Sequence, residues 1–357
     1  MKFKPILFFL VLFVCFVNGI SAQSGRTKPS PTPTPRGSIS GPSVLTAPTP
    51  SATKPSPTPS PTPKVSNDDV IKVESALVPI PVSVTDEHSR AMTDLKLEDF
   101  DLKIDGKHAT IAELSRSETP VRIAMLFDNS SSVLIARDFE KDAAVRFFRR
   151  VIRPDRDMAA LFSVADYTKR EQVLTSNVTQ LIQAIEAFPP PEGATALLDG
   201  IIEVADYLKS TNGRRVIVVV SDGEDTYSDP STTLDGVVKT LQLDNCQVYV
   251  VKTTDFENFK RTGIRGGNAN IRELTAERRM GEITQQTGGA VYSPIDEDEM
   301  KDAFDRISAE LSQQYILSYY PEDDTEKRGE LRAINLTVKG KANLTVRTRK
   351  GYYVPKK

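Results

Sequence analysis

The sequence Val121-Arg-Ile-Ala-Met-Leu-Phe-Asp-Asn-Ser-Ser-Ser132 begins as an apolar run of strand length and ends in a cluster of oxygen-bearing side chains. Apart from Arg122, nothing interrupts the apolar part. Such a run is typical of a strand that is buried on both faces of a parallel sheet. In parallel sheets, ligands bind in the loops beyond the carboxyl ends of the strands. We therefore expect the polar residues after Phe127 to lie at a functional edge.

From residue 121 to about residue 312, apolar strand patterns alternate with helical patterns of ten or more residues. Further strands are predicted over 158–164, 172–174, 216–220, 248–253 and 290–292. Helices are predicted to begin near 133, to cover 178–188, 234–241 and 297–311, and to end near 208 and 286. This alternation predicts the α/β class: a doubly wound, mostly parallel sheet with helices on both faces.

Two β-rich segments, 67–117 and 313–357, flank the α/β domain that we place at 118–312. The first contains Pro79 and Pro81, which predict an edge strand, and an Asp105-Gly106 hairpin signal. Each flank alone has too few strands to be stable. We therefore expect the flanks to pair and to form one small sandwich-like β domain, into which the α/β domain is inserted.

The first 22 residues are typical of a secretory signal peptide, with two lysines, an apolar core over 6–17 and small residues up to Ala22. The core is shorter than the roughly 20 residues of a membrane-spanning helix, so we expect cleavage after Ala22 and no transmembrane helix in the mature chain. Residues 23–66 are rich in Pro, Ser and Thr and predict an extended, disordered linker, either a spacer or an inert tail. We expect a secreted or periplasmic protein, with association to the cell envelope left open.

Composition excludes several classes of function. The net charge is −2 and no dense run of Lys and Arg occurs, which argues against nucleic-acid binding. Only His88 and His108 are present, which argues against a zinc site built from several histidines. Signal cleavage would leave Cys246 as the single cysteine, which rules out an intramolecular disulfide and predicts a buried, inert thiol.

Three predicted strand-end loops carry oxygen side chains, and these loops converge at one edge of a doubly wound sheet. They supply Asp128, Ser130 and Ser132, then Thr195, then Asp222. Carboxylates and hydroxyls are the ligands of a hard cation, Mg²⁺ first and Ca²⁺ or Mn²⁺ after it. Each residue also has a simpler interpretation, because the serines and Thr195 could cap helices and Asp222 could form a turn. Glu224 and Asp225 are interpreted as solvated loop charges in preference to extra metal contacts.

The order Asp-x-Ser-x-Ser, Gly-x-Thr and Asp-Gly resembles the von Willebrand factor type A domain over roughly residues 120–312. The flanking Leu97–Phe100, Asp105-Gly-Lys107 and Gly351-Tyr-Tyr353 resemble a bacterial exported subfamily with this domain, although the first spacing is shorter than expected.

The resemblance implies a metal-ion-dependent adhesion site. In it, Ser130 and Ser132 would ligate the metal through their hydroxyls, Thr195 directly or through water, and Asp128 and Asp222 mostly through water. An acidic side chain of a protein ligand would complete the coordination, which is binding and not catalysis. The family also implies that the last helix, 297–311, can shift when ligand binds.

Two alternatives stay open. In a Mg²⁺-dependent phosphotransferase-type enzyme, Asp128 would be the nucleophile. Such enzymes ordinarily carry a second Asp where this chain has Ser130, and neither histidine lies near these loops. A serine hydrolase is excluded because the Gly-x-Ser-x-Gly motif is absent. The second alternative is a structural envelope protein with a vestigial metal site.

Overall fold

The computed structural model describes residues 77–88, 90–116, 119–265, 270–321, 328–341 and 343–354. The predicted signal peptide (1–22), the predicted linker (23–66) and the first ten residues of the predicted N-terminal β module lie outside the described residues.

The central element is a six-stranded sheet with the strand order β10-β9-β8-β5-β6-β7. Five neighbouring strands are parallel, and only β7 runs antiparallel, to β6. The strands are β5 (Val121–Asp128), β6 (Met158–Val164), β7 (Thr168–Thr175), β8 (Arg214–Ser221), β9 (Cys246–Lys252) and β10 (Val291–Tyr292). The predicted doubly wound, mostly parallel sheet is confirmed.

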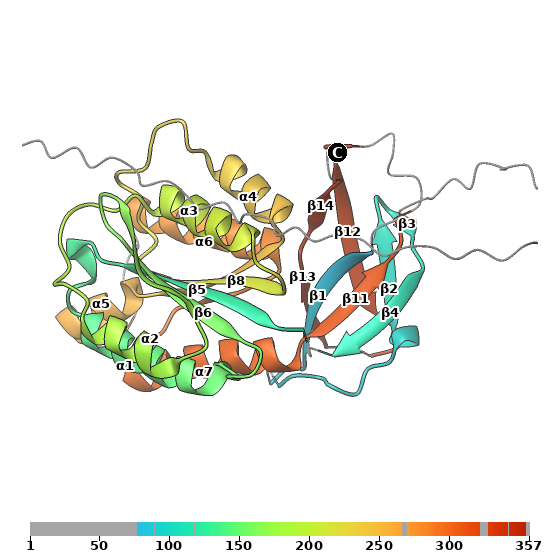
Figure 1. Ribbon diagram of the computed structural model, residues 1–357, viewed down its shortest axis with the longest axis horizontal. Helices are drawn as coiled ribbons and strands as arrows, with labels where there is room; N and C mark the ends of the chain where they lie inside the picture. Colours follow the sequence, from blue (N-terminus) through green and yellow to red (C-terminus); the bar gives the residue numbers. More distant parts are fainter. Residues whose placement is uncertain are drawn as a thin grey trace, which may run out of the picture. The chain divides into compact units, whose positions relative to one another are not determined.

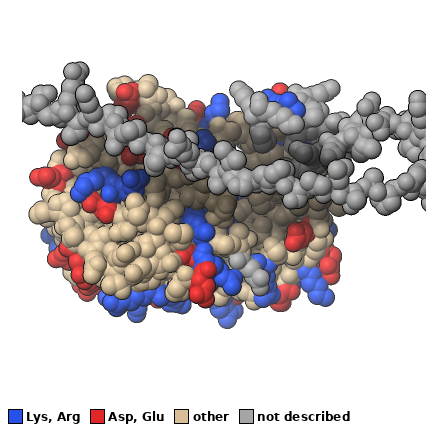
Figure 2. All heavy atoms as spheres, in the orientation of Figure 1, with Lys and Arg blue, Asp and Glu red and all other residues tan. Residues whose placement is uncertain are grey.

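Helices cover both faces of this sheet (Figure 1). One face packs against α1 (Arg137–Val151), α2 (Val178–Glu186) and α7 (Glu297–Gln313), and the other against α3 (Leu197–Lys209), α4 (Leu234–Leu243) and α6 (Ile271–Thr287). Among the described helices, none combines the length and the apolar character needed to cross a membrane. Acidic and basic side chains are interspersed over the face shown in Figure 2.

Two local predictions were wrong. The chain after β5 does not enter a long helix near residue 133. It first makes a short 3₁₀ helix (Ser131–Val133), and α1 begins at Arg137. The second error is α5 (Thr254–Thr262), which was not predicted because it is largely polar and buries only Phe256 and Glu257. Glu257 accepts a hydrogen bond from the backbone N–H of Ala136 at 3.0 Å, so α5 supports the start of α1.

The flanking strands pair with one another, as predicted. One sheet has the order β13-β1-β11-β4 and the other β14-β12-β2-β3, so each combines strands from before and after the α/β domain. A shared apolar core lies between the two sheets and contains, for example, Phe100, whose ring packs edge-on against Tyr315 at 5.6 Å. The strands are β1 (Val78–Thr85), β2 (Phe100–Ile104), β3 (Lys107–His108), β4 (Ile111–Arg116), β11 (Tyr315–Tyr319), β12 (Leu331–Val338), β13 (Thr345–Thr348) and β14 (Gly351–Tyr353).

The edge position predicted for β1 from its prolines is wrong, because β1 lies between β13 and β11. Strand β13 pairs only with the part of β1 from Val82 onward. The carbonyl oxygens of Pro79 and Pro81 accept hydrogen bonds from the side chains of Arg349 and Thr348. Because both prolines precede the segment paired with β13, a missing N–H breaks no ladder hydrogen bond there.

Candidate metal centre

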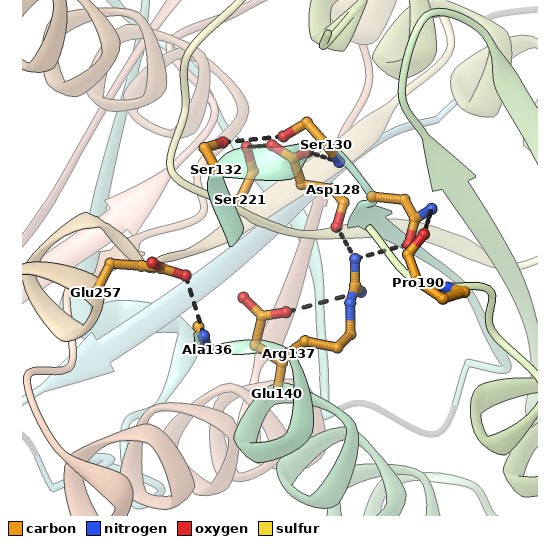
Figure 3. Close-up of polar contacts among 10 residues, drawn as sticks. Asp128, Ser130, Ser132, Ala136, Arg137, Glu140, Pro190, Ser221 and Glu257 are labelled. Carbon is orange, nitrogen blue, oxygen red and sulfur yellow. Dashed lines mark hydrogen bonds and ion pairs between the residues drawn. The ribbon is translucent and has the colours of Figure 1, made fainter. Parts of the chain in front are cut away.

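Asp128 ends β5 at the carboxyl edge of the sheet and is fully buried. The backbone N–H of Ser130 donates to its Oδ1 at 2.9 Å, and the Ser221 hydroxyl donates to its Oδ2 at 2.6 Å (Figure 3). Ser221 ends the neighbouring strand β8, and the parallel register beside β5 brings the two strand ends together. Both carboxylate oxygens of Asp128 are therefore held by neighbours.

The hydroxyl oxygens of Ser130 and Ser132 lie 3.0 Å apart and directly beside Asp128 (Figure 3). Neither serine caps a helix: the Ser130 side chain makes no capping hydrogen bond to the 3₁₀ helix, and α1 begins after Ala136. Two adjacent ligands of an octahedral Mg²⁺ at roughly 2.1 Å from the ion are about 3.0 Å apart. The two hydroxyls thus fit a magnesium ion, and their spacing is also that of a hydrogen bond.

Asp222 follows β8 at the same edge and is 8% exposed. Its Oδ1 accepts a hydrogen bond from the backbone N–H of Glu224 at 2.9 Å, and Gly223 between them has a φ of 81°. The turn that was the simpler interpretation of Asp222 is therefore present. It uses one carboxylate oxygen, and no hydrogen bond among the described residues engages the other.

Thr195 is buried, and hydrogen bonds tie its backbone to the loop that follows β8. Its N–H donates to the Thr226 hydroxyl at 3.0 Å, and its carbonyl accepts from the N–H groups of Thr226 and Tyr227. The loop that carries Thr195 is also joined to the loop after β5, since the Ser131 N–H and hydroxyl donate to the Gly193 carbonyl. The structure therefore links all three loops but shows no direct contact of the Thr195 hydroxyl with Asp128 or the serines.

The cap of α3 comes from Asp225 and not from Thr195. The Asp225 carboxylate accepts hydrogen bonds from the backbone N–H groups of Leu197 and Leu198 at 2.9 and 3.3 Å. Interpreting Asp225 as a solvated loop charge was wrong, because a cap formed by a residue 28 positions away leaves no local signal in the sequence. This cap leaves the Thr195 side chain free of a capping role.

Beneath the loop after β5, the structure places a buried ion pair that the sequence did not reveal. Arg137 donates from Nη2 to the backbone carbonyl of Asp128 at 2.5 Å and to Asn129 Oδ1 at 2.8 Å. Its Nη1 lies 3.8 Å from the Glu140 carboxylate, and both side chains are almost fully buried (Figure 3). Burial raises the pKa of Glu140 well above its ordinary value. The spacing of Arg137 and Glu140, three positions apart, is typical of an ion pair on a helix. It does not indicate that the pair faces the protein interior.

The carboxylates at the edge of the sheet repel each other. Burial raises the pKa of Asp128 to about 6, and the negative charge of Asp222 contributes to this rise, against the hydrogen bonds from Ser130 and Ser221. Among the described residues, no cationic side chain forms an ion pair with either aspartate. Arg137 lies close, but it binds the backbone of Asp128. The carboxylates and hydroxyls at this edge therefore lack a compensating positive charge, and a bound cation would supply it.

The family model of the von Willebrand factor type A domain matches residues 123–306, just over half of the chain. The chain therefore belongs to this family. No curated protein sequence matches it.

Three solved structures of bacterial proteins are similar to parts of the chain. One is the PilB minor pilin from Streptococcus sanguinis, with 14% identity, a TM-score of 0.41, and coverage of 55% of this chain and 62% of that one, so less than two thirds of the pilin is matched. Another is the conserved hypothetical protein BatB from Bacteroides thetaiotaomicron, with 15% identity, a TM-score of 0.40, and coverage of 53% and 98%. The third is the vWF domain of the type V pili tip protein Mfa5 from Porphyromonas gingivalis, with 12% identity, a TM-score of 0.41, and coverage of 53% and 94%. The family assignment depends on the domain match and not on these structures.

Proposed function

We propose that this chain is an exported, bacterial-type protein that binds a protein ligand through a divalent cation. Mg²⁺ is the cation we expect first. The cation would be held by the hydroxyls of Ser130, Ser132 and Thr195 and by the carboxylates of Asp128 and Asp222. Membership of the von Willebrand factor type A family supports a role in protein interaction.

The observation that carries the proposal is the convergence of the Ser130 and Ser132 hydroxyls beside buried, mutually repelling carboxylates. Two neutral hydroxyls and water-mediated carboxylates leave a bound cation under-neutralised. Such a cation would supply an attractive position for a further oxygen ligand. An acidic side chain of a partner protein satisfies that need, and the residues of this chain would hold and orient the site around it.

A cavity of about 450 Å³ beside the site gives a partner further surface to contact. Its lining includes Asn129 and Gly193, which adjoin the serine loop and the Thr195 loop, and the exposed ring of Tyr167. Lys169 and Glu171 also line it and form an ion pair with each other at 2.8 Å. This mixed lining suits a protein surface better than a single small charged group.

The geometry disfavours the phosphotransferase alternative. A nucleophilic carboxylate needs an oxygen that the substrate can reach, in line with the leaving group. Asp128 has no exposed surface, and both of its oxygens accept hydrogen bonds from Ser130 and Ser221, so it is not placed for in-line attack. A cation bound directly by the serine hydroxyls needs no direct contact with Asp128. We therefore favour binding over turnover.

Thermal unfolding with and without Mg²⁺ tests the metal site. We expect Mg²⁺ to stabilise the wild-type chain and Ser131→Ala, the matched control, because Ser131 lies between the two ligands but its described hydroxyl hydrogen bond goes to Gly193. The double variant Ser130→Ala/Ser132→Ala should show no Mg²⁺ effect.

Capture of partner proteins from a bacterial envelope extract, with Mg²⁺ or with EDTA, tests the binding function. Partners released by EDTA and not captured by the double variant would support the proposal. Turnover of a phosphate ester that requires Asp128 would instead identify an enzyme. If Mg²⁺ changes neither stability nor capture, a structural envelope protein with a vestigial site is the correct interpretation.

A further inference from the structure

A second cavity, of about 250 Å³, lies at the opposite edge of the central sheet, where the α/β domain meets the β domain. Its walls come from the starts of β8 and β9, from α4 and the end of α6, and from β1, β11 and the residue after β13. The described residues that line it include three arginines, namely Arg214, Arg215 and Arg349, and no carboxylate.

Arg349 reaches the cavity from the β domain and is only 6% exposed. Its guanidinium donates to the Asn245 side-chain carbonyl and, at 2.7 Å, to the Pro79 backbone carbonyl. The group also stacks over the Tyr352 ring, with its central carbon 5.7 Å from the ring centre. Its Nε has no hydrogen-bond partner among the described residues. Each described group that contacts this buried cation is therefore neutral.

Arg214 reaches the cavity from the α/β domain and is 9% exposed. It donates to the Gln314 side-chain carbonyl at 2.9 Å and to the Leu311 backbone carbonyl at 2.7 Å, and its Nε also lacks a partner among the described residues. Burial lowers the pKa of Arg214 and of Arg349 to about 10, which leaves both groups charged at neutral pH.

The third arginine, Arg215, likewise donates its hydrogen bonds to neutral groups. Arg215 directs its donors to the backbone carbonyls of Thr211 and Asp244. The Asp244 carboxylate lies nearby, but its Oδ1 is 3.1 Å from the Lys209 ammonium group, which already neutralises it. Buried charges are normally paired, because leaving one unpaired costs several kcal/mol. Among the described residues, three guanidiniums around one cavity thus have only neutral acceptors, which indicates a binding site for an anion.

We propose that this cavity binds a small organic anion, a carboxylate or phosphate that carries a short apolar group. The guanidinium groups of Arg349 and Arg214, whose described acceptors are all neutral, would bind the anionic oxygens, as guanidinium groups commonly do. Leu241 and Ile316 line the same cavity and would contact the apolar group. The volume is below the range of drug-sized pockets, which limits the ligand to a few heavy atoms.

The bound anion would contact both the α/β domain and the β domain. Arg349 belongs to the β domain, whereas Arg214 belongs to β8 and also holds the end of α7 through Leu311. An anion between them would therefore stabilise the contact between the domains. This site lies at the edge of the sheet opposite the candidate metal centre, so it does not depend on the proposed metal.

Calorimetric titration and thermal unfolding of the full chain in EDTA test the proposal, with butyrate, its neutral isostere butyramide, and inorganic phosphate as probes. We expect an anion to bind at least tenfold more tightly than butyramide and to raise the unfolding temperature. Stronger binding of butyrate would identify a carboxylate ligand, and stronger binding of phosphate would identify a phosphoryl ligand.

Variants locate the site. Arg349→Met should weaken anion binding at least tenfold. Arg349→Lys keeps the positive charge and disturbs the folded state less than the methionine does, and it should weaken anion binding less. Arg150→Met is the control, because Arg150 is exposed, pairs with Asp305, and does not line the cavity. Equal binding of butyrate and butyramide, no response to any anion, or an equal loss in Arg150→Met would overturn the proposal.

Discussion

Acidification from pH 7 to pH 5 should weaken Mg²⁺ binding about tenfold if Asp128 takes part in it as a carboxylate. The pKa of Asp128 is raised to about 6 by burial and by the charge of Asp222. About nine-tenths of the group is then ionised at pH 7 and about one-tenth at pH 5. Because protons and the cation compete for the same ionised form, the apparent affinity follows this fraction.

The same group makes the stability of the metal-free protein depend on pH. Its pKa in the folded state lies above the ordinary value of 3.8, so the folded state binds the proton more tightly than the unfolded state does. This contribution to stability is fully present below about pH 4 and is lost as the pH rises through about 6. At 1.36 kcal/mol per pKa unit, the loss is roughly 3 kcal/mol.

Urea unfolding between pH 4 and pH 7.5, in EDTA and in saturating Mg²⁺, measures both effects. Asp128→Asn is the reference variant, since it keeps the size of the side chain and removes its titration. Glu140 and Glu257 also have raised pKa values, so the difference between wild type and variant isolates Asp128. Equal pH slopes for the two proteins in EDTA would show that Asp128 does not titrate with a raised pKa. An Mg²⁺ affinity that does not change between pH 5 and pH 7 would show that its carboxylate takes no part in binding.

Four further substitutions, one of them a control, test individual contacts by urea unfolding. Gly289→Ala should prevent stable folding, because the added Cβ would lie 1.8 Å from a backbone oxygen of β9. In Gly281→Ala, inside α6, the added Cβ meets nothing within 4 Å, so this change should stabilise the protein by about 1 kcal/mol. Similar effects of the two substitutions on stability would contradict this expectation. Arg347→Met should cost roughly 3 kcal/mol, because it leaves the buried Glu310 carboxylate without its cation, and a cost below about 0.5 kcal/mol would show that the pair contributes little. Ser221→Ala removes the donor to the carboxylate at the end of β5 and should cost about 2 kcal/mol at pH 7 and less at pH 5, so a cost independent of pH would argue against this hydrogen bond to an ionised group.

The central sheet could be predicted because its strands are apolar on both faces. In β8, for example, the run Val216–Val220 has no polar residue that would place it in a loop or on a helix surface. The Asp105-Gly106 hairpin was predicted correctly for a related reason: both residues have positive φ, 49° and 78°, which this residue pair tolerates. Periodicity and turn chemistry are local, so the sequence alone reveals them.

Contacts between distant segments could not be predicted in the same way. The polar segment of α5 has a weak apolar pattern, and it is ordered partly because Glu257 accepts a hydrogen bond from Ala136. Pro79 and Pro81 correctly indicated a missing ladder bond, but whether β13 pairs beside them depends on where β13 ends.

The candidate site likewise combines features that are local in the sequence with contacts between distant segments. The Asp-x-Ser-x-Ser spacing was visible in the sequence, and the structure brings Asp128, Ser130 and Ser132 together. Ser221 was missed because nothing local distinguishes the last residue of an apolar strand from a strand end without a function. Its contact with Asp128 follows from the register between β8 and β5, which is set by the whole sheet.

Anomalous diffraction from a crystal of the chain soaked in Mn²⁺ would show directly whether the three loops bind a divalent cation. We expect one strong peak at the carboxyl edge of the central sheet, about 2.1–2.3 Å from the Ser130 and Ser132 hydroxyl oxygens. A saturating soak that leaves this position empty, or places Mn²⁺ only elsewhere, would contradict it.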